Sequence, residues 1–336
     1  MGLRLARGGD MIITRTPLRI SIGGGGTDLP SYYSRFGGLV ISAAINRYVY
    51  IALHSTFQRN YIIKYSQMET VEHIDEIRHP IVREALRLKE IEPRVEIISM
   101  ADIPAGTGLG SSGSFTVGLL RALYAYRREH VTTHALAEEA CHIEIDLLRE
   151  PIGKQDQYIA AFGGVNCLEI GKDGNVAVSP LRISTQTLHD LEDNLLMFFT
   201  GYSRNAGTVL ADQKQKTEGA DQAMIENLHL IKNLGSSIKA ALEKGDTHQF
   251  GELMHQHWLH KKQRSQGISN DQINRWYDVG HAHGAIGGKL IGAGGGGFLM
   301  FYAKDRAALR QAMAREGLDE VRFAFDFEGS KGLVQD

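Results

Sequence analysis

The feature that most constrains the fold is a glycine-rich segment between an expected strand and an expected helix. Four glycines and three serines occupy the eleven residues 104–114. Residues 95–100 before it have the pattern of a strand, and residues 115–126 after it form an apolar helical stretch. Glycines let backbone N–H groups approach a ligand closely, and a helix start carries partial positive charge. The segment therefore predicts a phosphate-binding loop, with an unliganded tight turn as the alternative.

The type of phosphate loop can be narrowed by its pattern. A P-loop requires GxxxxGK[ST], and no lysine precedes Ser114. A protein-kinase glycine loop would precede a strand, and no HRD or DFG motif occurs in a fitting place. Residues 108–113 do match GxGxxG, which keeps an NAD-dependent oxidoreductase open as an alternative. That fold needs a second strand with an acidic residue about 20 residues further on, whereas residues 130–149 are predicted to be helical.

A carboxylate lies on the apolar face of the helix predicted over residues 134–149. On a wheel of about 100° per residue, Glu144 falls inside an apolar arc made by Leu136, Ala137, Ala140, Cys141, Ile143, Leu147 and Leu148. A carboxylate that faces a core is costly unless it pairs with a cation or metal, and Mg²⁺ prefers oxygen ligands. Glu144 is therefore a candidate metal ligand, with a buried salt bridge to an arginine as the alternative.

A second carboxylate, Asp156, follows across a helix break at Pro151 and Gly153. Such a break can turn Asp156 toward the same pocket as Glu144, where its neighbour Lys154 would keep it ionised. The alternative is that Asp156 caps the short helix expected over residues 155–162.

The remaining elements follow from periodicity and from further glycine clusters. We expect strands over residues 18–22, 39–53, 195–200 and 298–302, and helical stretches over residues 206–265 and 270–283. A short helix should begin near Pro30, with Thr27 or Asp28 as its cap. A second glycine-rich segment covers residues 287–297, directly before the last of these strands.

Three motifs resemble those of the GHMP kinases, the family of galactokinase, homoserine kinase, mevalonate kinase and phosphomevalonate kinase, and they follow one another along the chain in the family's order. Residues 104–114 resemble the family's phosphate loop, residues 292–297 its C-terminal glycine motif, and residues 16–19 with 26–28 its N-terminal motif. One departure is that Leu18-Arg19 follows Pro17, where the family has Gly-Lys or Gly-Arg. The resemblance implies an α+β fold of two domains, an N-terminal α+β domain over residues 11–185 and a C-terminal ferredoxin-like domain over residues 186–336, with the active site between them.

The resemblance also implies roles for individual residues. Asp156 would orient or deprotonate the acceptor hydroxyl, with Arg19 close to the acceptor, and Ser112 and Glu144 would hold Mg²⁺. ATP would be bound by Pro104, Gly106, Thr107, Gly108, Leu109, Gly110, Ser111, Ser112, Gly113 and Ser114. The acceptor would be bound by Arg19, Gly26, Thr27, Asp28, Asp156, Arg204, Gly294 and Gly295.

The acceptor implied by the resemblance is a sugar. Residues 15–30 and 153–158 look closest to the heptose 7-phosphate kinases of the family, which phosphorylate the anomeric hydroxyl on the route to activated heptose for bacterial surface polysaccharide. The Gly-Thr-Asp and Gln-Asp-Gln elements also resemble fucose kinases, so a fucose-type sugar 1-kinase is the alternative. A phosphorylated acceptor needs a second anion site, for which Arg204 is the first candidate, followed by Lys154 and Arg35.

Composition restricts the partners. A formal net charge of −2 and a pI of about 6.7 provide no basic excess for nucleic acid or an anionic membrane. No apolar run approaches the ~20 residues of a membrane span, and two cysteines cannot form a disulfide framework. We therefore expect a cytoplasmic protein, with its oligomeric state open and a homodimer among the alternatives. The resemblance implies ATP and a small sugar phosphate as its ligands.

Two further hypotheses concern function. A non-catalytic, ligand-binding regulator with the same fold is an alternative, but the presence of Ser112, Glu144 and Asp156 together argues against it. His255, His257 and His260 occur at helical spacing without an obvious carboxylate or cysteine partner. We therefore expect surface or capping roles for these histidines rather than metal ligation.

Overall fold

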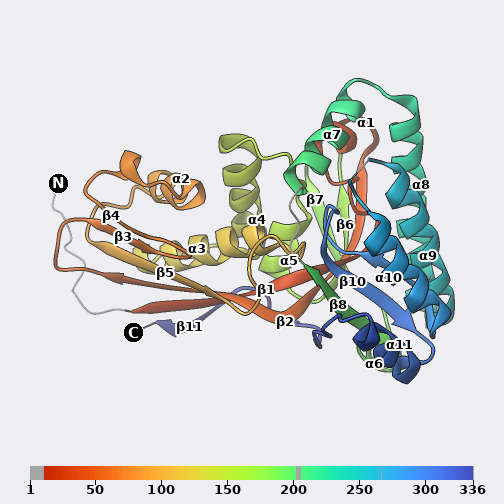
Figure 1. Cartoon of the computed structure of the whole chain (residues 1–336). Helices are drawn as coiled ribbons and strands as arrows, with labels where there is room; N and C mark the ends of the chain where they lie inside the picture. The colour runs from red at the N-terminus through yellow and green to blue at the C-terminus, as the bar shows by residue number, and fades with distance from the viewer. Residues whose placement is uncertain (1–10, 202–205, 266, 336) are drawn as a thin grey trace.

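The computed structural model describes residues 11–201, 206–265 and 267–335, which build two sheets and the helices that cover them. A long sheet runs along the molecule, and a smaller sheet lies at the end that carries the longest helices (Figure 1). The mixture of helices and mainly antiparallel strands confirms the α+β class and the two-domain fold. None of the helices in the described ranges is both long and apolar enough to cross a membrane.

The long sheet contains eight strands in the order β11-β1-β2-β5-β3-β4, with β6 paired to β2 and β7 paired to β6. These strands are β1 (Ile12–Gly23), β2 (Gly38–Ser55), β3 (Tyr61–Lys64), β4 (Met68–Val71), β5 (Val95–Ala101), β6 (Val165–Ile170), β7 (Val176–Pro180) and β11 (Lys331–Gln335). Among the described strands, β3 and β5 form the one parallel pair. The dinucleotide-binding alternative is therefore wrong, because it requires a parallel βαβ unit at the glycine loop.

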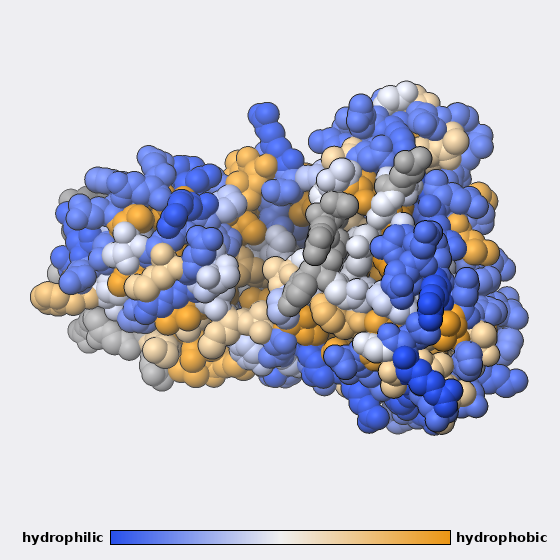
Figure 2. Space-filling model, in the orientation of Figure 1, coloured by the Kyte–Doolittle hydropathy of each residue, from blue (hydrophilic) through white to orange (hydrophobic). Residues whose placement is uncertain are grey.

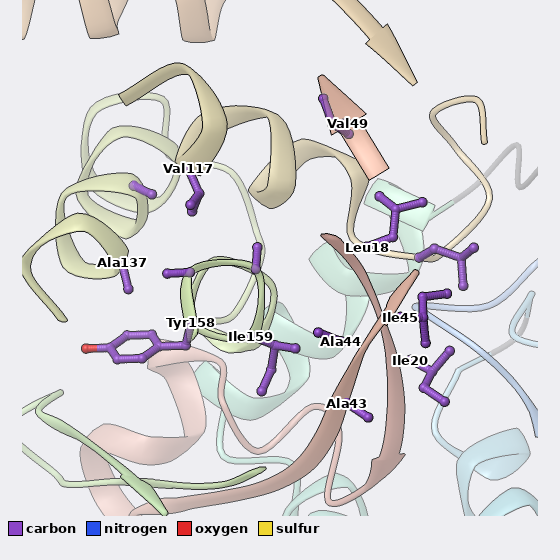
Figure 3. Packing of buried hydrophobic residues seen from close by; sticks show 14 of the residues in the cluster. Leu18, Ile20, Ala43, Ala44, Ile45, Val49, Val117, Ala137, Tyr158 and Ile159 are labelled. Carbon is purple, nitrogen blue, oxygen red and sulfur yellow. The ribbon is translucent and has the colours of Figure 1, made fainter. Parts of the chain in front are cut away.

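The helices that precede β6 contribute side chains to the core at this sheet. They are α1 (Pro30–Phe36), α2 (Pro80–Leu88), α3 (Ser111–Arg127), α4 (Thr133–Cys141), the π-helical turn η2 (His142–Leu147) and α5 (Gln155–Phe162), with a short 3₁₀ turn η1 (Ile74–Glu76) before α2. Both α3 and α5 contact β1 and β2. Leu18, Ile45, Val117 and Ile159, one from each of these four elements, are buried members of one hydrophobic cluster, part of which is shown in Figure 3. This core fixes the start of α3 and the start of α5 relative to β1.

The smaller sheet has the strand order β8-β10-β9, all antiparallel. Its strands are β8 (Leu195–Gly201), β9 (Ala285–Leu290) and β10 (Gly297–Ala303), and its helices are α6 (Thr185–Asn194), α7 (Ala206–Glu218), α8 (Gln222–Lys244), α9 (Thr247–Gln263), α10 (Asp271–Ala282) and α11 (Arg306–Arg315). Glu320 forms an isolated antiparallel bridge with Phe198 on the free side of β8. The resulting order is the ferredoxin-like one, with its fourth strand reduced to a single bridge.

The two sheets are joined by contacts beyond the chain connection between β7 and β8. Helix α8 packs on α9 and also on β1 and β2 of the long sheet. Strand β11, at the C-terminal end, pairs with β1, so that the last described residues belong to the long sheet. The predicted division after residue 185 remains a prediction, and residues 331–335 lie with the N-terminal sheet whichever boundary is chosen.

Two local expectations need correction. The cap of α1 is Leu29, without a side-chain hydrogen bond, because the Asp28 carboxylate accepts backbone N–H groups of Gly26 and Gln155 instead. Strand β9 lies where only a glycine-rich segment was expected. Its glycines permit close packing, since a Cβ at Gly287 would lie 2.0 Å from the carbonyl oxygen of Gly251 in α9.

Candidate active site

The glycine loop places free backbone donors at the start of α3. Gly106, Gly108 and Gly110 have φ values of +80°, +82° and +76°, the left-handed region that favours glycine. Helix α3 begins at Ser111, directly after Gly110, and no side chain caps it. Uncapped N–H groups at the start of a 17-residue helix form a ready site for phosphate.

The residues predicted to bind ATP are divided between surface and core. Pro104, Gly106 and Ser112 are exposed, whereas Thr107 and Leu109 are buried. Ser114 is also buried, and its hydroxyl donates to the carbonyl oxygen of Pro17. The loop therefore offers backbone and Ser112 to a ligand, while the side chains of the buried residues anchor it.

The second glycine motif lies against the first. A Cβ at Gly292 would lie 2.6 Å from the Cα of Gly108, and a Cβ at Gly108 would lie 2.7 Å from the carbonyl oxygen of Ile291. A Cβ at Gly297 would lie 2.2 Å from the carbonyl oxygen of Thr107. The segment between β9 and β10 thus positions the phosphate loop by backbone contact that only glycine permits.

Asp156 lies at the start of α5 and is held by Arg19 of β1. The Arg19 Nε donates to Asp156 Oδ1 at 2.7 Å, and the second guanidinium nitrogen donates to Oδ2 at 2.9 Å. The third guanidinium nitrogen donates to the carbonyl oxygen of Gly108 at 2.6 Å. Lys154, expected to keep Asp156 ionised, instead pairs with Glu138 at 3.0 Å. Arg19 therefore fixes both Asp156 and the phosphate loop in one geometry.

Glu144 and Ser112 are brought together as expected from the helix wheel. The Ser112 hydroxyl donates to Glu144 Oε2 at 2.5 Å, and the Gln157 amide donates to Oε1 at 3.1 Å. Glu144 is buried, which raises the pKa of its carboxyl above the ordinary value. Within the described residues it has no ion-pair partner, so the salt-bridge alternative is not what the structure contains. The Glu144 carboxylate and the adjacent Ser112 hydroxyl are oxygen ligands of the kind that suits Mg²⁺.

The helix containing Glu144 is not uniformly α-helical. Residues of η2 (His142–Leu147) form a π turn that follows α4 directly. The wider turn shifts the face that later residues present. Leu147, expected on the apolar stripe, is consequently 42% exposed, whereas Glu144 remains on the buried side.

The residues predicted to bind the acceptor occupy different positions. Gly26 and Asp28 line a cavity between the two sheets, which also contains Arg19 and Asp156. Thr27 is fully buried, and its hydroxyl bonds the carbonyl oxygens of Gly24 and Leu39, so it closes the loop after β1. Burial, followed by the charge of Asp156, raises the pKa of the Asp28 carboxyl. The surface is indented between the two ends of the molecule (Figure 2).

The far wall of this cavity comes from the smaller sheet and its helices. From the second glycine motif, Gly292 and Ala293 line the cavity. Gly294 and Gly295 do not line the cavity. Both are adjacent to Ile268, which does line it, and the carbonyl oxygen of Ile268 accepts the N–H of Gly295. Arg204, the first candidate for a second anion site, lies outside the described residues.

Four cationic or titratable residues of the cavity were missed as site residues. They are His257, Lys261, Arg264 and Lys289, all of them buried. The first three are spaced i, i+4 and i+7 along α9 and its C-terminal cap, on the same face as the buried Phe250 and Met254. The wheel argument used for Glu144 would have found them, because cations on a buried helical face need a partner.

His255, His257 and His260 of α9 do not form a metal site. His255 contacts Tyr277 and His281, whereas His257 lines the cavity and is buried rather than at the surface. The described part of the chain holds no group of three His, Cys, Asp or Glu side chains arranged for a metal ion. His257 therefore belongs to the lining of this cavity.

Comparison with known proteins identifies relatives along most of the chain. Residues 75–164 match the family model of the GHMP kinase N-terminal domain, and residues 238–318 match that of the C-terminal domain. The chain is 30% identical to a D-glycero-alpha-D-manno-heptose 7-phosphate kinase of Campylobacter jejuni, over 95% of this chain and 98% of that relative. It is 29% identical to the L-fucokinase/L-fucose-1-P guanylyltransferase of Bacteroides fragilis, over 88% of this chain and 35% of that protein.

A solved structure resembles the whole fold. The crystal structure of a D-glycero-D-manno-heptose 1-phosphate kinase from Bacteroides thetaiotaomicron superposes with a TM-score of 0.79 at 27% identity, covering 96% of this chain and 98% of that one.

Proposed function

The chain belongs to the GHMP kinases and is an ATP-dependent sugar kinase, and we propose that it transfers the γ-phosphoryl group of ATP to the anomeric hydroxyl of D-glycero-D-manno-heptose 7-phosphate. The product would be the 1,7-bisphosphate. Its relatives named for heptose kinases cover nearly the whole chain, and the chemistry of the cavity supports a phosphorylated acceptor.

The position of Asp156 carries this proposal. Its carboxylate lines the acceptor cavity, and its side chain also abuts the start of α3, since a Cβ at Gly113 would lie 2.8 Å from the Cβ of Asp156. Asp156 therefore stands between the loop that binds the donor phosphate and the cavity that binds the acceptor. A group that orients or deprotonates the attacking hydroxyl has to stand at that point.

Each residue of the site has a distinct part in the proposed reaction. Asp156 takes the proton of the acceptor hydroxyl while the oxygen of that hydroxyl bonds to the γ-phosphorus of ATP. The bond between the γ-phosphorus and the leaving ADP breaks in the same step. Arg19 holds Asp156 in place, and the start of α3 binds the phosphates. Ser112 and Glu144 would hold Mg²⁺, which when bound neutralises charge on the phosphates. Asp28, fixed by two backbone N–H groups, would accept hydrogen bonds from sugar hydroxyls.

The proposal is tested by comparing acceptors in one ATP-consumption assay. Heptose 7-phosphate should be used with a higher kcat/KM than mannose or fucose. An equal or higher kcat/KM for fucose would replace the heptose assignment by the fucose-type alternative, for which the Bacteroides fragilis relative is the present support.

The role of Asp156 is tested separately. Asp156→Asn should lower kcat by about 10²- to 10⁴-fold while ATP affinity stays within about twofold, because a positioned base acts on the transition state. A large loss of ATP binding with a small loss of kcat would assign Asp156 to the nucleotide site instead.

A further inference from the structure

A cluster of buried cations forms one wall of the acceptor cavity. His257 and Lys261 come from α9, Arg264 caps that helix, and Lys289 comes from the neighbouring strand β9. All four are at least nine-tenths buried by exposed fraction. Strand and helix are fixed against each other by the close contact at Gly287, so the cluster is rigidly built rather than collected from mobile surface side chains.

These side chains carry more hydrogen-bond donors than the surrounding protein groups accept. Lys289 Nζ donates to the carbonyl oxygen of Ile22 at 3.1 Å, and Lys261 Nζ donates to those of Leu290 and Gly292. Arg264 Nη1 donates to the carbonyl oxygen of Gly25 at 3.0 Å and to Gln213 Oε1 at 3.4 Å. The buried Nε of Arg264 and both ring nitrogens of His257 have no partner. An ammonium has three donors and a guanidinium five, so several donors in this wall are unsatisfied.

The carboxylate of Asp28, which lines the same cavity, attracts Arg264 from outside ion-pair distance. In the described ranges none of Lys261, Arg264 and Lys289 forms an ion pair, although ion pairs occur widely elsewhere in the chain. Burial, followed by the charges of Arg264 and Arg19, lowers the pKa of Lys289 to about 7. Burial also lowers the pKa of Arg264 to about 10, against the opposing charge of Asp28. A purely structural clamp on backbone carbonyls would not need four such groups together, because uncompensated buried charge is costly.

We propose that His257, Lys261, Arg264 and Lys289 form the subsite for the phosphate group carried by the acceptor sugar. This assignment rests on the proposed function, because it supplies the second anion site that a sugar phosphate requires. A phosphate ester offers three terminal oxygens and up to two negative charges, which match the free donors and the excess charge of the wall.

The geometry favours the acceptor's phosphate over the phosphates of ATP. The cavity that contains the cluster is lined by Arg19, Asp28 and Asp156 but by no residue of the phosphate loop, 104–114. The start of α3 already provides donors for the nucleotide. The same cavity can therefore hold one end of a sugar at Asp156 and its phosphate at the cations.

The test compares Lys289→Met and Lys261→Met with the control Lys304→Met, which changes an exposed lysine directly after β10. For the two cluster variants, KM for heptose 7-phosphate should rise about 10- to 100-fold, the range of a charge-assisted hydrogen bond. KM for ATP and KM for unphosphorylated heptose should stay within about twofold. Lys304→Met should match the wild type in all three.

Stability separates binding from a structural role. Methionine preserves most of the volume of lysine and removes a buried charge, so the ligand-free variants should keep the wild-type Tm within a few degrees. They should lose the rise in Tm that heptose 7-phosphate or mannose 6-phosphate produces in the wild type. A large drop in the ligand-free Tm with an unchanged KM for the sugar phosphate would show a structural clamp and overturn the subsite. A rise in KM confined to ATP would assign the cations to the nucleotide.

Two outcomes separate this proposal from the proposed function. If the wild type does not use heptose 7-phosphate as acceptor, the function fails, yet sugar phosphates that raise the Tm of wild type but not of Lys289→Met still support the subsite. If heptose 7-phosphate is a good substrate and both cluster variants keep its KM, the subsite fails and the function stands.

Proton uptake gives an independent measurement. An anion raises the pKa of a nearby lysine, so binding of heptose 7-phosphate at pH 8 should take up protons and weaken as pH rises. Calorimetry in buffers of different ionisation enthalpy measures this, and Lys289→Met should reduce it. The charged or titratable groups facing Lys289 are His257, Lys261, Arg264, Arg19, Asp156 and Asp28. Equal proton uptake in wild type and Lys289→Met would exclude Lys289 as the group that titrates.

Discussion

Replacing Gly292 by alanine should uncouple the second glycine motif from the phosphate loop. Gly292 has a φ of +77°, and a Cβ there would lie 2.6 Å from the Cα of Gly108. Real Cβ contacts are essentially never this short, so one of the two backbones must move by roughly 1 Å. Because Arg19 donates to the carbonyl oxygen of Gly108, that movement would also disturb the pair that Arg19 forms with Asp156.

The chain provides a matched control for backbone strain alone. Gly317 has a φ of +78° and is exposed, and a Cβ there would meet no atom within 4 Å. Both Gly292→Ala and Gly317→Ala incur the cost of a left-handed alanine, about 1–2 kcal/mol. The steric displacement occurs only in Gly292→Ala, so the difference between the two variants measures the contact between the loops.

Steady-state kinetics and thermal unfolding together check this expectation. A misplacement of about 1 Å can cost on the order of 10²-fold in rate, so kcat/KM of Gly292→Ala should fall about 10- to 100-fold. Gly317→Ala should retain wild-type kinetics and lose only a few degrees of Tm. Equal Tm values and equal kcat/KM for the two variants would refute the argument that the second glycine motif positions the phosphate loop.

Three further predictions follow from the site and the core. Glu144→Gln should preserve the fold, because burial already favours a neutral side chain there. The Mg²⁺ concentration that gives the half-maximal rate should rise about tenfold or more, and an unchanged Mg²⁺ dependence would remove Glu144 from the metal site. Gly153→Ala should raise the acceptor KM about tenfold with little change in KM for ATP, since its Cβ would lie 2.0 Å from Asp28 Oδ2; a normal acceptor KM would exclude Asp28 from acceptor binding. Cys141 and Cys167 should resist thiolate-directed reagents at pH 8 in the folded protein, because burial raises the pKa of both thiols, that of Cys167 to about 11. Rapid labelling of either cysteine without unfolding would contradict their buried state.

Local features of the sequence were sufficient for much of the fold. Strand β5, the glycine loop and helix α3 follow from alternation, glycine content and helical periodicity, all properties of short segments. The wheel placed Glu144 on the buried face because that argument needs only the residues of its own helix. The π turn at η2 was not foreseen, so Leu147 was assigned to the wrong face.

Only the tertiary structure decided which buried groups meet. Arg19 and Asp156 are 137 residues apart, and local periodicity can show that a carboxylate faces inward without showing which cation it faces. For the same reason the nearest lysine in sequence, Lys154, was wrongly chosen as the partner of Asp156. The contact between Gly108 and Gly292 and the cationic face of α9 at the acceptor cavity likewise arise from packing two domains together. The sequence by itself determined most of the elements and the kind of chemistry, whereas the position of Asp156 depends on a contact with a segment more than a hundred residues away.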